Sequence, residues 1–306
     1  MKFTIYQESR PGKRANNEDR LAYCYSRDAL LMVVADGMGG HYYGEIAAQI
    51  AVQTLVENFQ REAKPEIADP FMFLQKSMVN AHRAITDFTD AHRLKDSPRT
   101  TCVACIIQNN IAYWAHAGDS RLYLMRDGKV LSHTRDHSRV QLLIDQGAIN
   151  EAEAATHPER NKVYSCLGGM QAPEIAFSRK TPLEAGDVVM LCTDGLWGNL
   201  PGDQMAAALE AGNLMQIVPA LLVQAESRGG PSADNLSTVV VRWEDSYTAP
   251  GTGHSSAIST QTMSHDTVTT KLDAFGRNPK YKTELSEDEI ERAIEEIRST
   301  IQKYSK

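Results

Sequence analysis

Aspartates beside strand-like apolar runs are the residues of this chain best suited to chemistry. They occur in four short motifs: Asn17-Glu18-Asp19-Arg20, Ala35-Asp36-Gly37-Met38-Gly39-Gly40-His41, Thr193-Asp194-Gly195 and Ser232-Ala233-Asp234-Asn235. Strand ends that meet would pool these carboxylates, and such a cluster is costly unless cations neutralise it. Hard divalent cations such as Mg²⁺ and Mn²⁺ prefer oxygen ligands. The pattern therefore predicts a site for divalent cations.

Glycine follows the aspartate in Asp36-Gly37 and Asp194-Gly195. A glycine at a strand end permits a sharp turn and lets a backbone carbonyl approach a metal. Turn formation alone would explain any one such pair, and we accept that explanation for Asp127-Gly128. Several motifs in this order, with these flanks, favour one shared site over unrelated turns.

The segments next to the motifs have the character of strands. Leu30–Ala35 and Val188–Cys192 are short apolar runs that end just before a motif aspartate. Asn109-Asn110 and Asp127-Gly128 are hairpin signals between further strand-like runs. Hairpins imply antiparallel sheet.

Two long helices are expected to cover this sheet. Apolar residues at roughly helical spacing follow Gly44. A second helix should begin at Asp69-Pro70, because aspartate caps helices and proline fits the first helical position. We therefore predict an α+β layered sandwich with its helices outside.

Composition excludes several classes of protein. The 306 residues are 42% hydrophobic and 23% charged, as in ordinary globular proteins. The net charge of -7 argues against a nucleic-acid binder, which needs a basic face. No apolar stretch follows the start and no apolar run could span a bilayer, so neither a signal peptide nor membrane insertion is expected. A cytoplasmic protein is the resulting prediction.

Two of the five cysteines, Cys102 and Cys105, have the CxxC spacing of zinc and redox sites. They lie in the β-branched and apolar run Thr101–Ile107, which predicts a strand. Residues three apart on a strand point to opposite faces. Buried, reduced thiols are therefore the favoured interpretation.

The chain divides by composition near residue 245. Residues 1–244 form the expected globular domain, and residues 245–282 are a linker rich in Ser, Thr and Gly. Residues 283–306 predict an amphipathic helix that begins with the capping box Ser286/Glu289. A helix this short is marginal alone, so it should pack on its own domain, on a partner or on a second copy of the chain.

Six segments in order resemble the motifs of the PP2C (PPM) phosphatase family in its bacterial form: NEDR, VVADGMGGHYYGEIAA, HAGDSRLYL, DHSRVQLLIDQGAI, LCTDGLW and DNLSTVVV. The resemblance covers residues 1–244. It implies a four-layer αββα sandwich of two antiparallel sheets flanked by helices. It also implies hydrolysis of phosphoserine and phosphothreonine in proteins, dependent on two Mn²⁺ or Mg²⁺ ions.

The resemblance also implies a role for each motif residue. Asp36 would bridge two ions, with the Gly37 carbonyl on one of them, and Arg14 would grip the substrate phosphate. Asp194 and Asp234 would complete one ion's shell, and Glu18 and Asp19 would serve the other. Asp119 with Asp194 would hold a third, weaker ion. Water shared by two cations loses a proton easily, which would give a hydroxide that attacks phosphorus.

The chain departs from the family pattern at two positions. Met38 stands where eukaryotic relatives often have a histidine proposed as general acid, and the nearest histidine is His41. His41 would either protonate the leaving alkoxide or hold the loop, and we favour the loop. Arg99 replaces a common glycine, which should alter a loop near the site. Residues 137–170 resemble the flap segment of the bacterial members, where sequence helps set substrate preference. The histidines in or near it are expected to be structural: His133, His137 and His157.

An alternative hypothesis is a silent module that keeps the fold and binds phosphoproteins or a kinase. The intact aspartates favour the enzyme, since a silent protein has little reason to keep a costly carboxylate cluster. The expected partners are phosphoprotein substrates, including a serine/threonine kinase by family resemblance.

Overall fold

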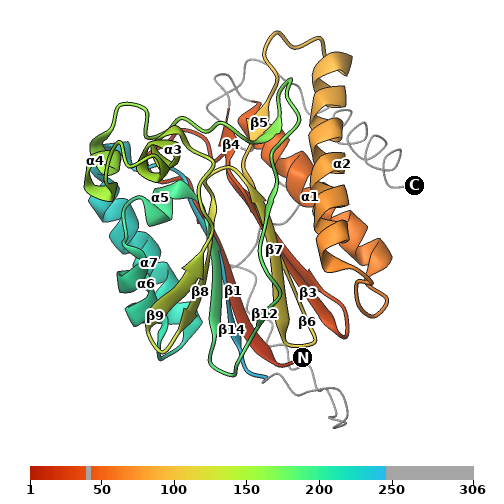
Figure 1. The fold of residues 1–306 in the computed structure, drawn as a ribbon, viewed down its shortest axis with the longest axis vertical. Coiled ribbons are helices and arrows are strands. Elements are labelled where there is room, and N and C mark those ends of the chain that lie inside the picture. Colours follow the sequence, from red (N-terminus) through yellow and green to blue (C-terminus); the bar gives the residue numbers. More distant parts are fainter. Residues whose placement is uncertain (39–42, 246–306) are drawn as a thin grey trace.

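The computed structural model describes residues 1–38 and 43–245. Two antiparallel sheets lie face to face, with α1 and α2 on one outer side and α6 and α7 on the other (Figure 1). The predicted four-layer α+β sandwich is therefore confirmed. Residues 246–282 of the predicted linker, the predicted C-terminal helix and His41 all lie outside the described residues. Within the part described, no helix combines the length and apolar character that crossing a bilayer requires.

The first sheet joins the two ends of the described chain. Its strands are, in spatial order, β1 (Phe3–Arg10), β14 (Leu236–Trp243), β13 (Val188–Cys192), β8 (Arg121–Arg126) and β9 (Lys129–His133). β1 pairs with β14 along its whole length, from Phe3 opposite Trp243 to Arg10 opposite Leu236.

The second sheet is built around β3. Its strands are β11 (Ala176–Phe177), β7 (Ile111–Ala117), β6 (Cys102–Gln108), β3 (Ala29–Ala35) and β2 (Arg20–Tyr25), and β12 (Thr181–Pro182) also pairs with β7. A small third sheet has the order β10 (Leu167–Gly168), β5 (Arg99–Thr100) and β4 (Gly37–Met38).

The helices complete the layers. They are α1 (Gly44–Glu62), α2 (Pro70–Ala91), α3 (Arg139–Asp145), α4 (Glu151–Thr156), α5 (Asp194–Trp197), α6 (Gly202–Leu209) and α7 (Leu214–Gly229), with a 3-10 turn at Gly230–Ser232. α1 and α2 pack on the second sheet, and α6 and α7 pack on the first. A separate apolar layer between the sheets includes Met32, Val189 and Val239, each fully buried. This layer fixes how the strand ends of the two sheets face each other.

Local sequence signals explain several elements. Asp69 caps α2 by accepting a hydrogen bond from the Met72 backbone N–H (3.1 Å). Asn109 and Asn110 both have positive φ (54° and 56°), as a two-residue type I′ hairpin requires. Cys102 packs under the helices and Cys105 packs between the sheets, so the two thiols lie on opposite faces of β6 as expected.

Candidate metal centre

Strand pairing brings the motif aspartates to one end of the sandwich. Arg20 at the start of β2 lies opposite Ala35 at the end of β3, so Asp19 and Asp36 are neighbours. Cys192 at the end of β13 lies opposite Thr238, close to the start of β14, and Asp194 and Asp234 flank that junction. The Asp36 carboxyl is repelled by the charges of four nearby carboxylates: Asp19, Asp194, Asp119 and Asp234. The predicted cluster is therefore assembled from both sheets.

The backbone of Asp36 is held on both sides by a threonine pair. Its N–H donates to Thr101 Oγ1 (3.0 Å), and its carbonyl accepts from Thr101 N–H and Thr100 Oγ1 (2.9 Å each). Thr101 Oγ1 also shares a hydrogen bond with Ser120 Oγ (2.7 Å), next to Asp119. Thr101 thus links two of the acidic segments. Nothing in the sequence around Thr101 indicates this role.

The carboxyl groups of Asp36 and Asp194 lie within hydrogen-bonding reach of each other. Burial and the nearby Asp19 raise the pKa of Asp36 well above its usual range. Burial and Asp234 raise the pKa of Asp194 to about 6. Burial and Asp194 likewise raise the pKa of Asp119 well above the ordinary value. These carboxyls therefore retain protons that a bound cation would replace.

One carboxylate oxygen of Asp19 has no hydrogen-bond partner in the described part of the chain. Its side chain is 2% exposed, and Oδ2 accepts from Thr193 Oγ1 (2.9 Å). Oδ1 is buried without a hydrogen-bond partner among the described residues. Burial raises the pKa of Asp19 to about 7. An orphaned buried carboxylate oxygen in an acidic cluster fits a cation or its bound water as the missing partner.

The side chain of Glu18 lies against a glycine at the start of α1. A Cβ on Gly44, the first residue of α1, would collide with Glu18 Oε2. A Cβ on Gly37 would likewise collide with the carbonyl oxygens of Gly44 and Glu18. Burial, followed by the charge of Glu45, raises the pKa of Glu18 to about 7. Both glycines are therefore needed for the close approach of Glu18 to the Asp36 loop.

Arg14 and Asp234 meet at the rim of the cluster. Arg14 is exposed, and its Nη2 donates to Asp234 Oδ2 (2.7 Å). Asn235 ties this rim together: its Oδ1 accepts from the Glu18 N–H (2.8 Å) and its Nδ2 donates to the carbonyls of Pro11 and Asn16 (2.9 Å each). The guanidinium predicted to grip phosphate thus lies beside the acidic cluster.

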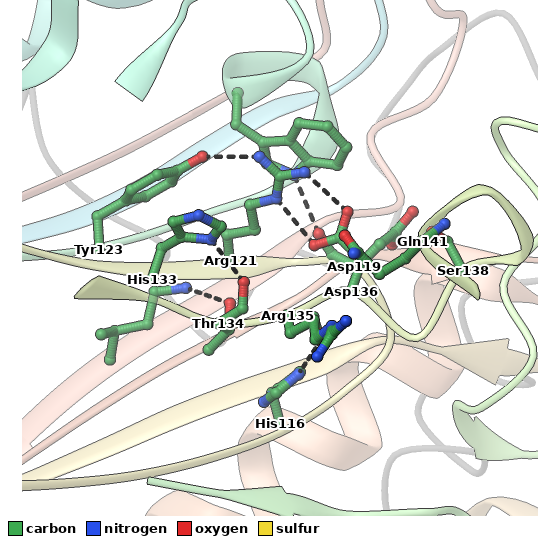
Figure 2. A network of polar contacts seen from close by, with 12 residues as sticks. His116, Asp119, Arg121, Tyr123, His133, Thr134, Arg135, Asp136, Ser138 and Gln141 are labelled. Carbon is green, nitrogen blue, oxygen red and sulfur yellow. Dashed lines mark hydrogen bonds and ion pairs between the residues drawn. The ribbon is translucent and has the colours of Figure 1, made fainter. Parts of the chain in front are cut away.

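Asp119 lies close to Arg121 and Asp136, within a polar network (Figure 2). Its carbonyl accepts from Trp197 Nε1 (3.0 Å). Gly118, which precedes it, has a φ of +112°, and a Cβ there would lie 2.6 Å from the side chain of Thr101. His137 lies next to His116: its ring stacks on that of His116 and is tilted against that of Tyr164 (ring centroids 4.7 and 5.4 Å apart). His137 is therefore part of the packing.

The small third sheet links the Asp36 loop to the flap. Gly37 lies opposite Thr100, and Thr100 also lies opposite Leu167. Arg99 lies opposite both Met38 and Gly168, and its side chain is exposed. The unusual arginine thus stands in the middle strand, beside the predicted site.

The donor set fits divalent cations with mixed shells. No group of three His, Cys, Asp or Glu side chains in residues 1–38 and 43–245 converges tightly enough to hold one ion alone. Backbone carbonyls and water would therefore complete each shell, as is usual for Mg²⁺. The raised pKa values, the orphaned Asp19 oxygen and the all-oxygen chemistry agree with such ions. Every predicted site residue except His41, which is not described, belongs to this one end of the sandwich.

Comparison with known proteins gives the family. The family model described as protein phosphatase 2C matches residues 7–216. The serine/threonine protein phosphatase PstP of Mycobacterium tuberculosis is 33% identical over 227 residues, which are 74% of this chain and 42% of that protein. A putative protein phosphatase 2C-type of Streptococcus pyogenes is 30% identical over 234 residues, 76% of this chain and 94% of the relative.

A solved relative carries metal. The catalytic domain of a PstP in complex with two manganese ions superposes with a TM-score of 0.67 at 29% identity, covering 79% of this chain and 99% of that one. This chain spans less than half the length of the Mycobacterium PstP that it matches. The match of the family model, together with the shared αββα architecture, means that this chain belongs to the protein phosphatase 2C family.

Proposed function

We propose that this protein is a protein serine/threonine phosphatase that depends on Mn²⁺ or Mg²⁺. The observation that carries the proposal is the gathering of six acidic side chains beside an exposed arginine: Glu18, Asp19, Asp36, Asp119, Asp194 and Asp234, next to Arg14. Carboxylates placed this close need cations, and an arginine at their rim suits a phosphate ester.

The roles proposed for the chain's residues follow from their positions. Asp36 would bridge two cations with the Gly37 carbonyl beside it, Asp194 and Asp234 would hold one, and Glu18 and Asp19 the other. When bound, the cations supply Lewis acidity that neutralises phosphate oxygens and acidifies water. Arg14 would orient the phosphate through its planar fork, which fits two oxygens and keeps its charge. Asp234, which already accepts from Arg14, would hold the fork in place.

Hydrolysis of p-nitrophenyl phosphate with and without Mn²⁺ tests the proposal. The wild-type protein should be stimulated by Mn²⁺, whereas Asp36→Asn should lose at least about a hundredfold in kcat/KM while its circular dichroism stays native. Absence of Mn²⁺-stimulated turnover would leave the phosphoprotein-binding module as the better explanation. Near-normal rates in Asp36→Asn would refute the metal assignment.

The proposal extends to the organisation and partners of the chain. Residues 1–244 would be the catalytic unit of a cytoplasmic enzyme, supported by β14, which pairs with β1 along its whole length and ends at Trp243. Its substrates would be phosphoproteins, including a serine/threonine kinase. Residues 245–282 would tether the helix 283–306, which would bind a partner or a second copy. Truncation after residue 244 tests this, and unchanged activity and oligomeric state would count against any role for the tail.

A further inference from the structure

Arg121, the first residue of β8, is engaged on three sides. Its Nε and Nη2 form a fork on Asp136, with both hydrogen bonds at 2.8 Å. Its Nη1 donates to the Tyr123 hydroxyl (3.0 Å), and Figure 2 shows the guanidinium between these two partners. Its Cζ lies 3.5 Å from the centroid of the Trp197 ring. A guanidinium held this way has one orientation.

These contacts reach two acidic residues of the metal centre through Trp197. The indole N–H of Trp197 donates to the carbonyl of Asp119 (3.0 Å). Trp197 also ends α5, the four-residue helix that Asp194 begins. Arg121 itself pairs with Cys192, two residues before Asp194. One side chain therefore braces the segments that carry Asp119 and Asp194.

The other end of the fork reaches the start of the flap. Asp136 is buried, and the next residue, His137, donates its backbone N–H to the Gly118 carbonyl (2.9 Å). The Gly118 N–H returns a hydrogen bond to His137 Nδ1 (3.4 Å). Arg121, Asp136, His137 and the Gly118-Asp119 step thus form a closed ring of contacts around the Asp119 backbone.

The same strand offers a matched comparison. Arg126, the last residue of β8, forms a similar fork on Asp187 (2.6 and 2.8 Å). Asp187 directly precedes β13, so this second pair joins the same two strands at the end away from the aspartates. Arg126 Nη1 also donates to Glu184 Oε1 (2.5 Å), so the Arg126 pair joins the sheet to the loop before β13. What distinguishes Arg121 is the stacked Trp197 and its link to Asp119.

We propose that Arg121 is a positioning residue that sets the separation of Asp119 and Asp194 and thereby the affinity for the cation these two residues hold. The inference rests on the metal-dependent function proposed above. Lysine keeps the charge but cannot form the fork or the planar stack. Arg121→Lys should therefore weaken binding of that cation by about 10- to 100-fold, the usual effect of losing a group that orients metal ligands.

The test is calorimetric titration of MnCl₂ into the full chain after metal removal with EDTA. We expect wild-type protein and Arg126→Lys to bind Mn²⁺ with the same affinity at the weak site formed by Asp119 and Asp194. Arg121→Lys should lose affinity at that site alone. Trp197→Phe keeps an aromatic face but lacks the N–H donor to Asp119, so it should weaken binding at the same site. It also provides the test if Arg121→Lys fails to fold.

Three results would overturn the inference. The first is a folded Arg121→Lys or Trp197→Phe variant that binds Mn²⁺ at the weak site as tightly as wild type. The second is an equal loss of weak-site affinity in Arg126→Lys. The third is a wild-type titration that shows no weak site. Activity measured on the same samples separates this inference from the function. If wild type turns over substrate with Mn²⁺ while Arg121→Lys binds Mn²⁺ normally, only the role of Arg121 fails. If wild type neither binds Mn²⁺ nor responds to it, the proposed function fails as well.

Discussion

Metal affinity should depend steeply on pH, because protons and cations compete for the same carboxyls. Burial raises the pKa of Glu18 and of Asp19 to about 7, and that of Asp194 to about 6. A carboxyl with a raised pKa keeps its proton at pH values where an ordinary one is ionised. It must release that proton before it holds a cation, so Mn²⁺ affinity falls as the pH falls through 7.

The size of the effect follows from these pKa values. Displacing one proton costs about 1.4 kcal/mol for each pH unit below the pKa. From pH 8 to pH 6, each carboxyl with a pKa near 7 therefore weakens Mn²⁺ binding about tenfold. Glu18 and Asp19 together give about a hundredfold, and Asp194 adds little because its pKa lies at the lower end of the range. Asp36, whose pKa burial and Asp19 also raise, can only increase this effect. Since neighbouring carboxyls share protons, we expect a change of at least about tenfold.

Calorimetry measures both the affinity and the protons released. Mn²⁺ is titrated into EDTA-treated protein at pH 6 and pH 8, each in two buffers of different ionisation heat. More protons should be released at pH 6, and Glu18→Gln should release about one fewer there. The His137 imidazole has a pKa lowered to about 4 by burial, so it stays neutral at both pH values. An affinity that does not change between pH 6 and pH 8, without proton release, would refute the assignment of these carboxyls as ligands.

Three further predictions concern the same centre. Mn²⁺ at about 100 times its Kd should stabilise the folded protein by about 2.7 kcal/mol. Differential scanning calorimetry should show this as a Tm about 5–10 °C higher than that of EDTA-treated protein. An unchanged Tm would contradict a metal site. Arg14→Ala should lower kcat/KM for p-nitrophenyl phosphate by about 10- to 100-fold, the loss of a charge-assisted hydrogen bond, whereas its Tm should hardly change because the side chain is exposed. Gly118→Ala should lower the free energy of unfolding by about 1–3 kcal/mol in a denaturant titration, since its Cβ would lie 2.6 Å from the Thr101 side chain. Gly147 also has positive φ, but no atom lies within 4 Å of the position of its Cβ. Gly147→Ala should therefore lower the free energy of unfolding by less in the same titration.

Elements with a local cause were predictable from the sequence. The strand Val188–Cys192 has the predicted bounds, because an apolar run between turn residues has few alternatives. The hairpin at Asp127-Gly128 was predictable because both residues adopt positive φ (49° and 68°), which few other pairs tolerate. The acidic cluster was predictable for a related reason: antiparallel neighbours bring the end of one strand beside the start of the next.

Contacts between distant segments left no local signal. β4, β5 and β10 have two residues each, and their pairing joins Gly37 with Thr100 and Thr100 with Leu167. No periodicity exists in a two-residue strand. The bond from Thr193 Oγ1 to Asp19 spans 174 positions, and the Trp197–Asp119 bond spans 78. Such partners are chosen by the packing of whole layers, so they emerge only from the assembled fold.

The pairing of β1 with β14 has a consequence for how the protein is made. During synthesis, Phe3–Arg10 leaves the ribosome more than 200 residues before Leu236–Trp243. Because β14 is the only strand that pairs with β1 in the first sheet, β1 remains unpaired for about 10–50 s at ordinary elongation rates. Asp234 emerges in the same late stretch as β14. A nascent or prematurely terminated chain therefore lacks a strand and an acidic residue of the centre at once. Catalytic competence should arise in one late step, and unfinished chains should be inactive.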